Sequence, residues 1–461
     1  MPRDFQLTID FLANAAAKWP NKPSVICGER SFTYADVERM SAELAAGLRD
    51  RYGVGPGTRV GIAMRNRGEI AAAYWAAQRL GAAVLPINYR LGTQSLRHLL
   101  AEADLACLIC DAAGWQGLKD AAGDIRARTI AVEVSIDGAA AWDDMFGHGT
   151  AAEYTAFDTS SPAVILYTSG TTGLPKGAVM THETLMVNVR VAVVAHSLRH
   201  EDVYILAIPF FVPTACYSLI NAAAYLGATL VMAPDPDMAT VVPLIEKWRC
   251  SVFFGVPTLF FFLTTWPALS RYDVSSLRLI AYSGSPMPTR TIRKLRELLP
   301  GVWLHNFFGL TETIAMTHVL ADCYADTHPE SIGKLLPEVD AAVVGEDGRR
   351  LPPGAVGELV FRRDIVIPEY WGRPGLLEES IKNGWFHTGD LASVDNDGFF
   401  YVHGRSKDMI IVAGQNVYAL EVEQVIMRME QVREVAVVGV PATGVREALG
   451  ELIKAVVVPH P

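Results

Sequence analysis

The sequence has no uninterrupted apolar stretch near the roughly 20 residues that a transmembrane helix requires. Its N-terminal residues, Met1 to Asp10, include acidic side chains where a secretory signal peptide would be apolar. Only 6 of the 461 residues are cysteine, a content typical of a reducing compartment. These absences predict a cytoplasmic protein without a transmembrane segment.

The chain also has no basic run, and its 40 Lys and Arg residues against 50 Asp and Glu residues give a net charge of −10. This balance argues against nucleic-acid binding. Any anionic ligand must therefore be captured by a local site, against the overall field of the protein. A homodimer is compatible with the sequence, which does not specify an assembly.

One pair of cysteines, Cys107 and Cys110, has the C-x-x-C spacing of metal and redox sites. The segment reads Leu-Ala-Cys-Leu-Ile-Cys, and no second Cys or His pair stands nearby. We therefore predict a buried strand in which both cysteines act as small apolar side chains.

Helical and strand patterns alternate over most of the chain. An amphipathic helix is predicted over 33–52 with Thr33 as its cap, followed by a strand over 59–64, a helix over 69–80 and a strand over 82–86. The alternation recurs over 204–310. It predicts an α/β fold with parallel sheets and flanking helices.

The pattern changes after Lys334, where short strands separated by Gly, Pro and Asp turns predict a β-rich subdomain over about 335–403. The polar segment 404–408 reads as a linker or hinge. Strands over 409–412, 434–440 and 452–458 and a helix over 420–430 then predict a small α+β domain. The expected division is an N-terminal domain over 1–407 and a partial C-terminal domain over 408–461.

The most informative segment is residues 167–182, which follow an apolar run that predicts a buried strand. It combines glycines, which let backbone N–H groups converge, with hydroxyls and a mobile lysine charge. Such a set can cradle a polyphosphate. It is not the Walker loop, because Lys176 follows Pro175 and Gly177 stands in place of the metal-binding hydroxyl. The predicted phosphate ligands are Thr168, Ser169, Gly170, Thr171, Thr172, Gly173 and Lys176.

A second polar loop, Asn306 to Glu312, contains a flat ring at Phe308 that can stack on a base. Thr311 can bond a phosphate, and Glu312 is a hard oxygen ligand suited to Mg²⁺. The structural alternative is a helix start, with Thr311 as the N-cap.

Three shorter segments also have structural alternatives. Residues 385–390 end in Thr-Gly-Asp, which is common in β-turns, and residues 282–286 fit a strand-to-helix turn. Residues 404–408 fit a solvated charge cluster.

Together, in this order and spacing, the five segments resemble the adenylate-forming enzymes, and in particular the AMP-forming acyl-CoA synthetases. The resemblance implies catalytic roles for Lys176, Thr311 and Glu312, with Glu312 on the metal. It implies Asp390 on the ribose hydroxyls, Arg405 on the nucleotide and Asp408 as a hinge. The remaining adenine and ribose contacts it implies are Gly284, Ser285, Pro286, Asn306, Phe307 and Phe308. It places Ala413 and Gly414 on a coenzyme A tunnel, and the acyl pocket at Val212, Pro213, Thr214, Gly284, Gly309, Ile314 and Ala315.

The chain departs from the family pattern at several of these positions. Val212 replaces a histidine, so the pocket beside the carboxylate should be more apolar than usual. Phe308 replaces a tyrosine and Ala413 a glycine, while Phe307 should block a straight fatty-acyl tunnel and favour a compact hydrophobic or aromatic acid. The sequence ends at Pro461, before the lysine loop that family members carry, and we expect truncation to account for this.

The implied function is ATP- and Mg²⁺-dependent conversion of a hydrophobic aliphatic or aromatic acid to an acyl-adenylate, followed by transfer to coenzyme A. The implied partners are the acid, ATP and coenzyme A. Two alternatives remain at this point: an adenylation enzyme that serves a carrier protein, and a non-catalytic protein that binds a nucleotide or acyl-adenylate.

Overall fold

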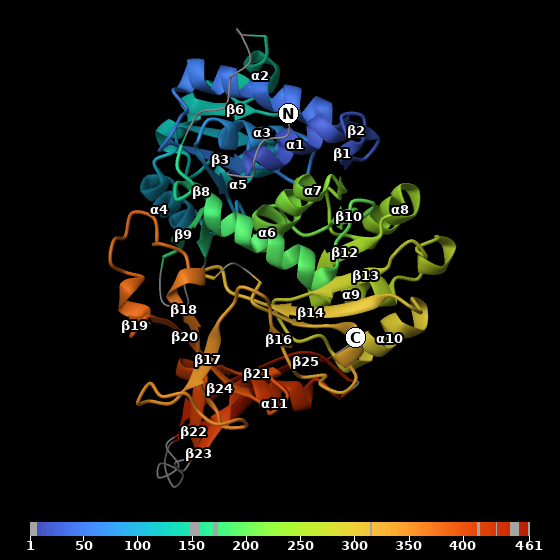
Figure 1. The fold of residues 1–461 in the computed structure, drawn as a ribbon, viewed down its shortest axis with the longest axis vertical. Helices are drawn as coiled ribbons and strands as arrows, with labels where there is room; N and C mark the ends of the chain where they lie inside the picture. The colour runs from blue at the N-terminus through green and yellow to red at the C-terminus, as the bar shows by residue number, and fades with distance from the viewer. Residues whose placement is uncertain are drawn as a thin grey trace. The chain divides into compact units, whose positions relative to one another are not determined.

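The computed structural model describes residues 7–147, 157–168, 174–313, 316–412, 415–429, 431–442 and 451–459. The chain packs as two compact units (Figure 1). Unit 1 contains residues up to Ala281 together with Gly309–Met316 and Ile367–Leu377, and unit 2 contains Tyr282–Phe308, Thr317–Val366 and the chain from Glu378 onward.

Unit 1 contains a seven-stranded sheet whose central pairs are parallel and whose last pair, β8 with β9, is antiparallel. In spatial order its strands are β7 (Ala140–Ala141), β6 (Thr129–Ala131), β5 (Cys107–Cys110), β3 (Arg59–Ala63), β4 (Ala83–Pro86), β8 (Pro162–Thr168) and β9 (Lys176–Thr181). Parallel strands joined through helices are the arrangement that the alternating sequence pattern predicts.

A second run of strands in unit 1 is also mainly parallel, with antiparallel β2 at its edge. In order these are β13 (Leu279–Tyr282), β12 (Val252–Gly255), β10 (Val203–Leu206), β11 (Thr229–Met232), β1 (Pro23–Cys27) and β2 (Arg30–Thr33). The described helices of unit 1 are α1 (Ile9–Lys18), α2 (Tyr34–Tyr52), α3 (Glu69–Arg79), α4 (Thr93–Ala103), α5 (Ala112–Leu118), α6 (His182–His196), α7 (Ile220–Leu226), α8 (Met238–Trp248) and α9 (Pro257–Thr265).

Local signals determine where α2 begins and ends. The Thr33 hydroxyl accepts a hydrogen bond from the Asp36 N–H, and the Asp36 carboxylate accepts one from the Thr33 N–H, which completes a capping box. Gly53 ends the helix at φ 64°, a left-handed conformation that glycine adopts without a steric penalty. The predicted helix over 33–52 and its Thr33 cap are confirmed.

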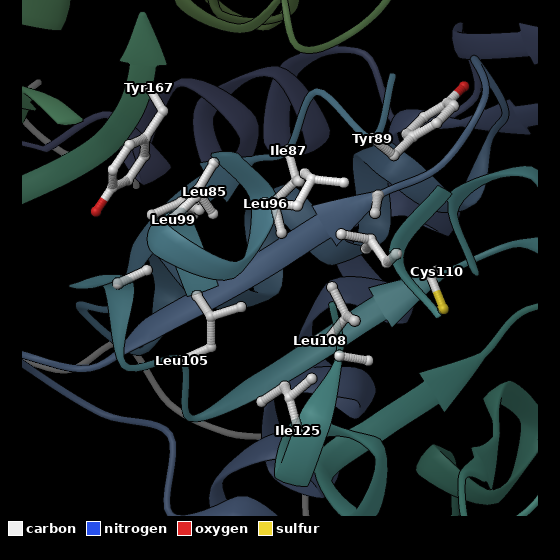
Figure 2. Packing of buried hydrophobic residues seen from close by; sticks show 14 of the residues in the cluster. Leu85, Ile87, Tyr89, Leu96, Leu99, Leu105, Leu108, Cys110, Ile125 and Tyr167 are labelled. Carbon is white, nitrogen blue, oxygen red and sulfur yellow. The ribbon is translucent and has the colours of Figure 1, made fainter. Parts of the chain in front are cut away.

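Leucine side chains from α4 (Leu96 and Leu99), β4 (Leu85) and β5 (Leu108) form a core beside the seven-stranded sheet (Figure 2). Cys107 and Cys110 are fully buried in β5, and burial raises the pKa of each thiol to about 12. Thiols at that pKa are protonated and poor metal ligands. The prediction that this C-x-x-C pair belongs to a buried strand is confirmed.

Unit 2 is rich in short antiparallel strands, as predicted for the residues after Lys334. It contains β14 (Trp303–Phe308), β15 (His318–Leu320) and β16 (Lys334–Leu335), the sheet β17 (Ala341–Val344), β18 (Gly357–Arg362), β20 (Trp385–Val394), β19 (Ile381–Lys382) and β21 (Phe400–Arg405), and the pairs β22 (Met409–Val412) with β23 (Gln415–Tyr418) and β24 (Val432–Pro441) with β25 (Glu451–Pro459). Its described helices are α10 (Thr289–Leu298) and α11 (Ala419–Ile426).

Two predictions in this region need correction. The 404–408 segment is not an irregular linker, because Gly404 and Arg405 complete β21 and Ser406–Asp408 form a 3₁₀ turn. The helix predicted over 420–430 already ends at Ile426. None of the helices in the described part of the chain is both long and apolar enough to span a bilayer.

One buried histidine of unit 1, His182, is held neutral by its surroundings. The Thr8 hydroxyl donates to the side-chain oxygen Oε1 of Gln78 at 2.7 Å. The hydrogen bond between Thr8 Oγ1 and His182 Nδ1, also 2.7 Å, must therefore be donated by Nδ1–H. Nε2 is buried with no hydrogen-bond partner among the described residues. Burial lowers the pKa of His182 to about 4.

Unit 1 should therefore lose stability as the pH falls. An unfolded chain takes up this proton near pH 6.5, whereas the folded chain takes it up only near pH 4, so between these values the free energy of unfolding should fall by about 1.4 kcal/mol per pH unit. Melting temperatures measured from pH 8 to pH 4 should fall less steeply for His182→Gln than for the unsubstituted protein. Identical slopes would contradict this assignment.

Candidate functional site

The predicted phosphate loop lies at the end of a β-hairpin in unit 1. Thr168, the last residue of β8, is paired across the ladder with Lys176, the first residue of β9. This pairing places the Thr168 hydroxyl and the Lys176 ammonium group at the two ends of the predicted phosphate loop. The loop residues Ser169, Gly170, Thr171, Thr172 and Gly173 lie outside the described part of the chain.

Thr311 and Glu312 form a turn, with no helix beginning at Thr311. The Thr313 hydroxyl closes the turn by accepting from the Leu310 N–H at 3.2 Å and donating to the Leu310 carbonyl at 3.1 Å. The Glu312 carbonyl accepts a backbone hydrogen bond from Ile367 at 2.8 Å. The helix-cap alternative is therefore wrong. The Glu312 backbone is fixed by the turn between Leu310 and Thr313 and by the hydrogen bond from Ile367.

Tyr370 lies between the two charged residues predicted to act on ATP. Its hydroxyl donates to Glu312 Oε1 at 2.8 Å, and Lys176 Nζ lies 5.4 Å from the centre of its ring. The ring is buried, and burial and the adjacent Glu312 carboxylate raise the Tyr370 pKa, so the phenol stays protonated as a donor. We did not predict Tyr370 from the sequence. It stands 58 residues from Glu312, and no local pattern distinguishes it from a core aromatic.

The predicted acyl-pocket residues of unit 1 follow the carboxyl end of β10. Val212, Pro213 and Thr214 are half-buried, and Thr214 begins a π-helical stretch, Thr214–Leu219. Strand β10 pairs with β11 on one side and with β12 on the other, so the next two strands in the sequence lie on opposite sides of it. In α/β proteins such a switch point is the usual place for a ligand.

The side chain of Asn66 fixes the backbone at this strand end. Its Nδ2 donates to the Leu206 carbonyl at 3.2 Å and to the Ile208 carbonyl at 2.9 Å. Gly309 is half-buried in unit 1, whereas Ile314 and Ala315 lie outside the described residues.

In unit 2, Asp390 and Arg405 face each other across the β20–β21 ladder. Arg405 Nε lies 2.6 Å from Asp390 Oδ1, and Asp390 is only 5% exposed. The family resemblance implies that both side chains bind the nucleotide, and the structure pairs them with each other. This ion pair orients the Asp390 carboxylate.

The β-turn alternative for Thr388 to Asp390 is wrong, because these residues lie inside β20. The register of β20 against β18 shifts here, and Gly389 adopts φ 75°, as expected for a β-bulge. The Thr388 hydroxyl accepts from the Asp390 N–H at 3.0 Å, and Glu358 Oε1 accepts from the Gly389 N–H at 2.9 Å. The bulge therefore sets the direction of the Asp390 side chain.

The predicted adenine contacts of unit 2 lie on a loop and a strand. Gly284, Ser285 and Pro286 are exposed in the connection between β13 and α10, which is compatible with both the binding role and the simple turn. On β14, Asn306 Nδ2 donates to the Ser331 carbonyl at 3.2 Å. Phe307 is buried, while Phe308 is half-buried, and consecutive strand residues point to opposite faces.

The remaining predicted residues concern the hinge and the coenzyme A tunnel. Asp408 is exposed at the end of the 3₁₀ turn that follows β21. Ala413 and Gly414 lie outside the described part of the chain. The hinge and tunnel roles stay predictions.

Glu312 suits a magnesium ion that is carried by a polyphosphate. No cluster of three or more His, Cys, Asp or Glu side chains that could hold a metal occurs among the described residues, so they offer no all-protein cage. Mg²⁺ is commonly bound through one or two carboxylates, with substrate phosphates and water as the other ligands. A single carboxylate that contacts the same tyrosine as Lys176, the predicted phosphate ligand, fits that arrangement.

The sequence and the fold are both similar to known enzymes. The family model "AMP-binding enzyme" matches residues 12–371. A feruloyl-CoA synthase of Amycolatopsis sp is 33% identical over 449 residues, covering 95% of this chain and 86% of that protein. A long-chain-fatty-acid–CoA ligase of Mycobacterium tuberculosis is 32% identical over 440 residues, covering 92% of this chain and 83% of that protein.

Among solved structures, an anthranilate CoA ligase in complex with anthranoyl-AMP superimposes with a TM-score of 0.90, covering 100% of this chain and 88% of that chain. Its identity to this chain is 23%, so it supports the fold alone. The family match covers more than half of the sequence, and both curated relatives exceed 30% identity. This chain belongs to the AMP-binding enzyme family.

Proposed function

We propose that this protein is an AMP-forming acyl-CoA ligase that activates a hydrophobic aliphatic or aromatic acid. One observation carries the proposal: Lys176 and Glu312 approach the same side chain, Tyr370, within unit 1. A cation suited to phosphate oxygens thus lies near a carboxylate suited to Mg²⁺. The similarity to named CoA ligases over more than 90% of the chain supports the same class of reaction.

In the first half-reaction, a carboxylate oxygen of the acid attacks the α-phosphorus of ATP and the bond to pyrophosphate breaks. The products are an acyl-adenylate and pyrophosphate. Lys176 and the Thr168 hydroxyl would hold the negative charge that develops on the leaving group. Glu312 would bind Mg²⁺, which neutralises phosphate charge when it is bound.

In the second half-reaction, the thiolate of coenzyme A attacks the acyl carbon and AMP leaves. AMP is a far better leaving group than the oxide of a free carboxylate, which is why the adenylate must form first. Asp390 and Arg405 would hold the ribose side of the nucleotide through both steps, since the β-bulge orients Asp390 and the ion pair holds Arg405 beside it.

For the acid, we propose a compact hydrophobic substrate. Val212 places an aliphatic side chain where the family commonly has a histidine, and the half-buried Val212–Thr214 wall has no charged side chain. Within unit 2, Phe307 is a bulky aromatic residue of β14, and the resemblance alone implies that it blocks a straight fatty-acyl tunnel. The relatives are named for an aromatic acyl group and for long-chain fatty acids, so both classes belong in a test.

The decisive test is product analysis with the 461-residue chain, Mg-ATP, coenzyme A and matched panels of aromatic and aliphatic acids. We expect AMP, pyrophosphate and an acyl-CoA in equal amounts, with compact acids preferred over long-chain acids. Acid-dependent AMP formation without a thioester would point to another acceptor. Formation of ADP, or turnover that does not depend on the acid, would contradict the proposal.

Replacing Lys176 by alanine should impair the use of ATP but not folding. Loss of one charge-assisted phosphate contact should lower kcat/KM for ATP by about 10-fold to 100-fold, since such bonds contribute roughly 1.5–3 kcal/mol. Lys119→Ala, at an exposed position in unit 1, is the matched control and should leave ATP kinetics unchanged. Normal ATP kinetics in Lys176→Ala at an unchanged melting temperature would remove this residue from the phosphate site.

Replacing Val212 by histidine should alter acid selection. The imidazole adds a polar, titratable group to an aliphatic wall, so the preference should shift from apolar toward polar acids, or the thioester-forming step should change in rate. The comparison is kcat/KM across the acid panel for both proteins. An unchanged profile together with an unchanged rate would place Val212 outside the acid pocket.

A further inference from the structure

The Ile367–Leu377 segment of unit 1 lies along β9, although the two are far apart in the sequence. The Trp371 N–H donates to the Gly177 carbonyl at 2.7 Å, and the Val179 N–H donates to the Glu369 carbonyl at 3.3 Å. Tyr370 stands between these two bonds, bridged to Ala178. Its backbone position is therefore determined by the strand that begins with Lys176.

Side chains hold the other side of the same segment against α4. Arg373 Nε lies 2.7 Å from Glu102 Oε1, and Arg373 Nη2 donates to the Pro175 carbonyl at 3.1 Å. Trp371 Nε1 donates to the Glu102 carbonyl at 3.3 Å. Because Pro175 directly precedes Lys176, these contacts fix the segment and the base of the phosphate loop together.

From these contacts we propose that Tyr370 is a positioning residue for the metal ligand: its hydroxyl holds Glu312 by Oε1 and leaves Oε2 to face the metal of Mg-ATP. The inference rests on the proposed function, because it assumes that the site binds ATP with Mg²⁺. It adds a role for a residue that neither the sequence motifs nor the family match assigns.

A hydrogen-bond donor on one carboxylate oxygen limits the ways in which that carboxylate can bind a cation. An unrestrained glutamate rotates freely and can bind a cation through either oxygen or both. The Tyr370 phenol occupies Oε1, and no described residue donates to Oε2. Restricting Glu312 to one oxygen suits Mg²⁺, which demands near-ideal octahedral geometry and is poorly matched by a chelating carboxylate.

The Tyr370 side chain is also buried, so the position of its ring is restricted. The face of the same ring attracts Lys176, whose Nζ lies 5.4 Å from its centre. One rigid side chain thereby limits the freedom of both the metal ligand and the phosphate-binding cation.

The test is calorimetric binding of ATP, without any acid, over a series of Mg²⁺ concentrations. This measures binding rather than turnover. Tyr370→Phe keeps the ring under Lys176 and removes only the hydroxyl, so binding of metal-free ATP should be unchanged. The Mg²⁺ concentration that gives half of the metal-dependent gain in affinity should rise by about 10-fold, as is typical when a partner of a metal ligand is removed.

A matched control lies in unit 2, where the Tyr401 hydroxyl donates to Asp395 Oδ2 at 3.1 Å. Tyr401→Phe removes the same kind of phenol–carboxylate bond from a carboxylate other than Glu312 and should not change the Mg²⁺ dependence. A second control is Glu312→Gln. If Tyr370 acts through Glu312, adding Tyr370→Phe in that background should have no further effect on the metal.

Several results would overturn the inference. If unsubstituted protein binds ATP in a metal-dependent way and Tyr370→Phe does so equally well or better, the phenol does not position Glu312 for the metal. An equal loss for metal-free ATP, or a persistent loss in the Glu312→Gln background, would assign Tyr370 a general packing role. If the unsubstituted protein binds no ATP, the proposed function fails, and this inference fails with it.

Discussion

The predicted phosphate site in unit 1 depends on one constraint: the backbone pairing of β9 with residues 369–371. Two backbone hydrogen bonds fix this pairing, and a third joins Ile367 to the Glu312 carbonyl. Lys176 begins β9, Tyr370 lies in the paired segment, and Glu312 is tied to the start of that segment. Three residues far apart in the sequence are therefore positioned by main-chain geometry, which is stiffer than any side-chain contact among them.

The charge of the chain explains why this rigidity matters. The protein carries a net charge of −10 and is proposed to bind a nucleoside triphosphate, so long-range attraction gives no help. Binding must come from a few fixed groups whose orientation is set before the ligand arrives. In unit 2 the Asp390–Arg405 pair shows the same principle, since a β-bulge and an ion pair at 2.6 Å define the direction of a buried carboxylate.

The sequence was most informative where a structure depends on neighbours along the chain. The Thr33 cap of α2, the parallel α/β alternation and the buried C-x-x-C strand all follow from local patterns, and all are confirmed. The structure of the Thr-Gly-Asp segment was harder to predict, because a Gly-Asp pair is compatible with both a β-turn and a β-bulge. Only the register against β18 decides between them.

The site could be predicted as a list of residues but not as a set of contacts. Motifs indicated Lys176, Glu312, Asp390 and Arg405, yet the ion pair between the last two depends on the register of β20 and β21. Tyr370 was missed because its role comes from contacts with residues far away in the sequence: the hydrogen bond to Glu312 across 58 residues and the backbone pairing with β9. Such contacts leave no periodicity or spacing in the local sequence. An aromatic residue in a Gly- and Pro-rich stretch reads equally well as core packing.

The central claim is that a carboxylate of the substrate attacks the α-phosphorus of ATP. It can be tested directly with an acid whose carboxyl oxygens carry a heavy isotope, by mass spectrometry of the nucleotide after turnover with coenzyme A. The account predicts that AMP acquires one heavy oxygen and that pyrophosphate acquires none. Unlabelled AMP, or ADP accompanied by labelled phosphate, would contradict it.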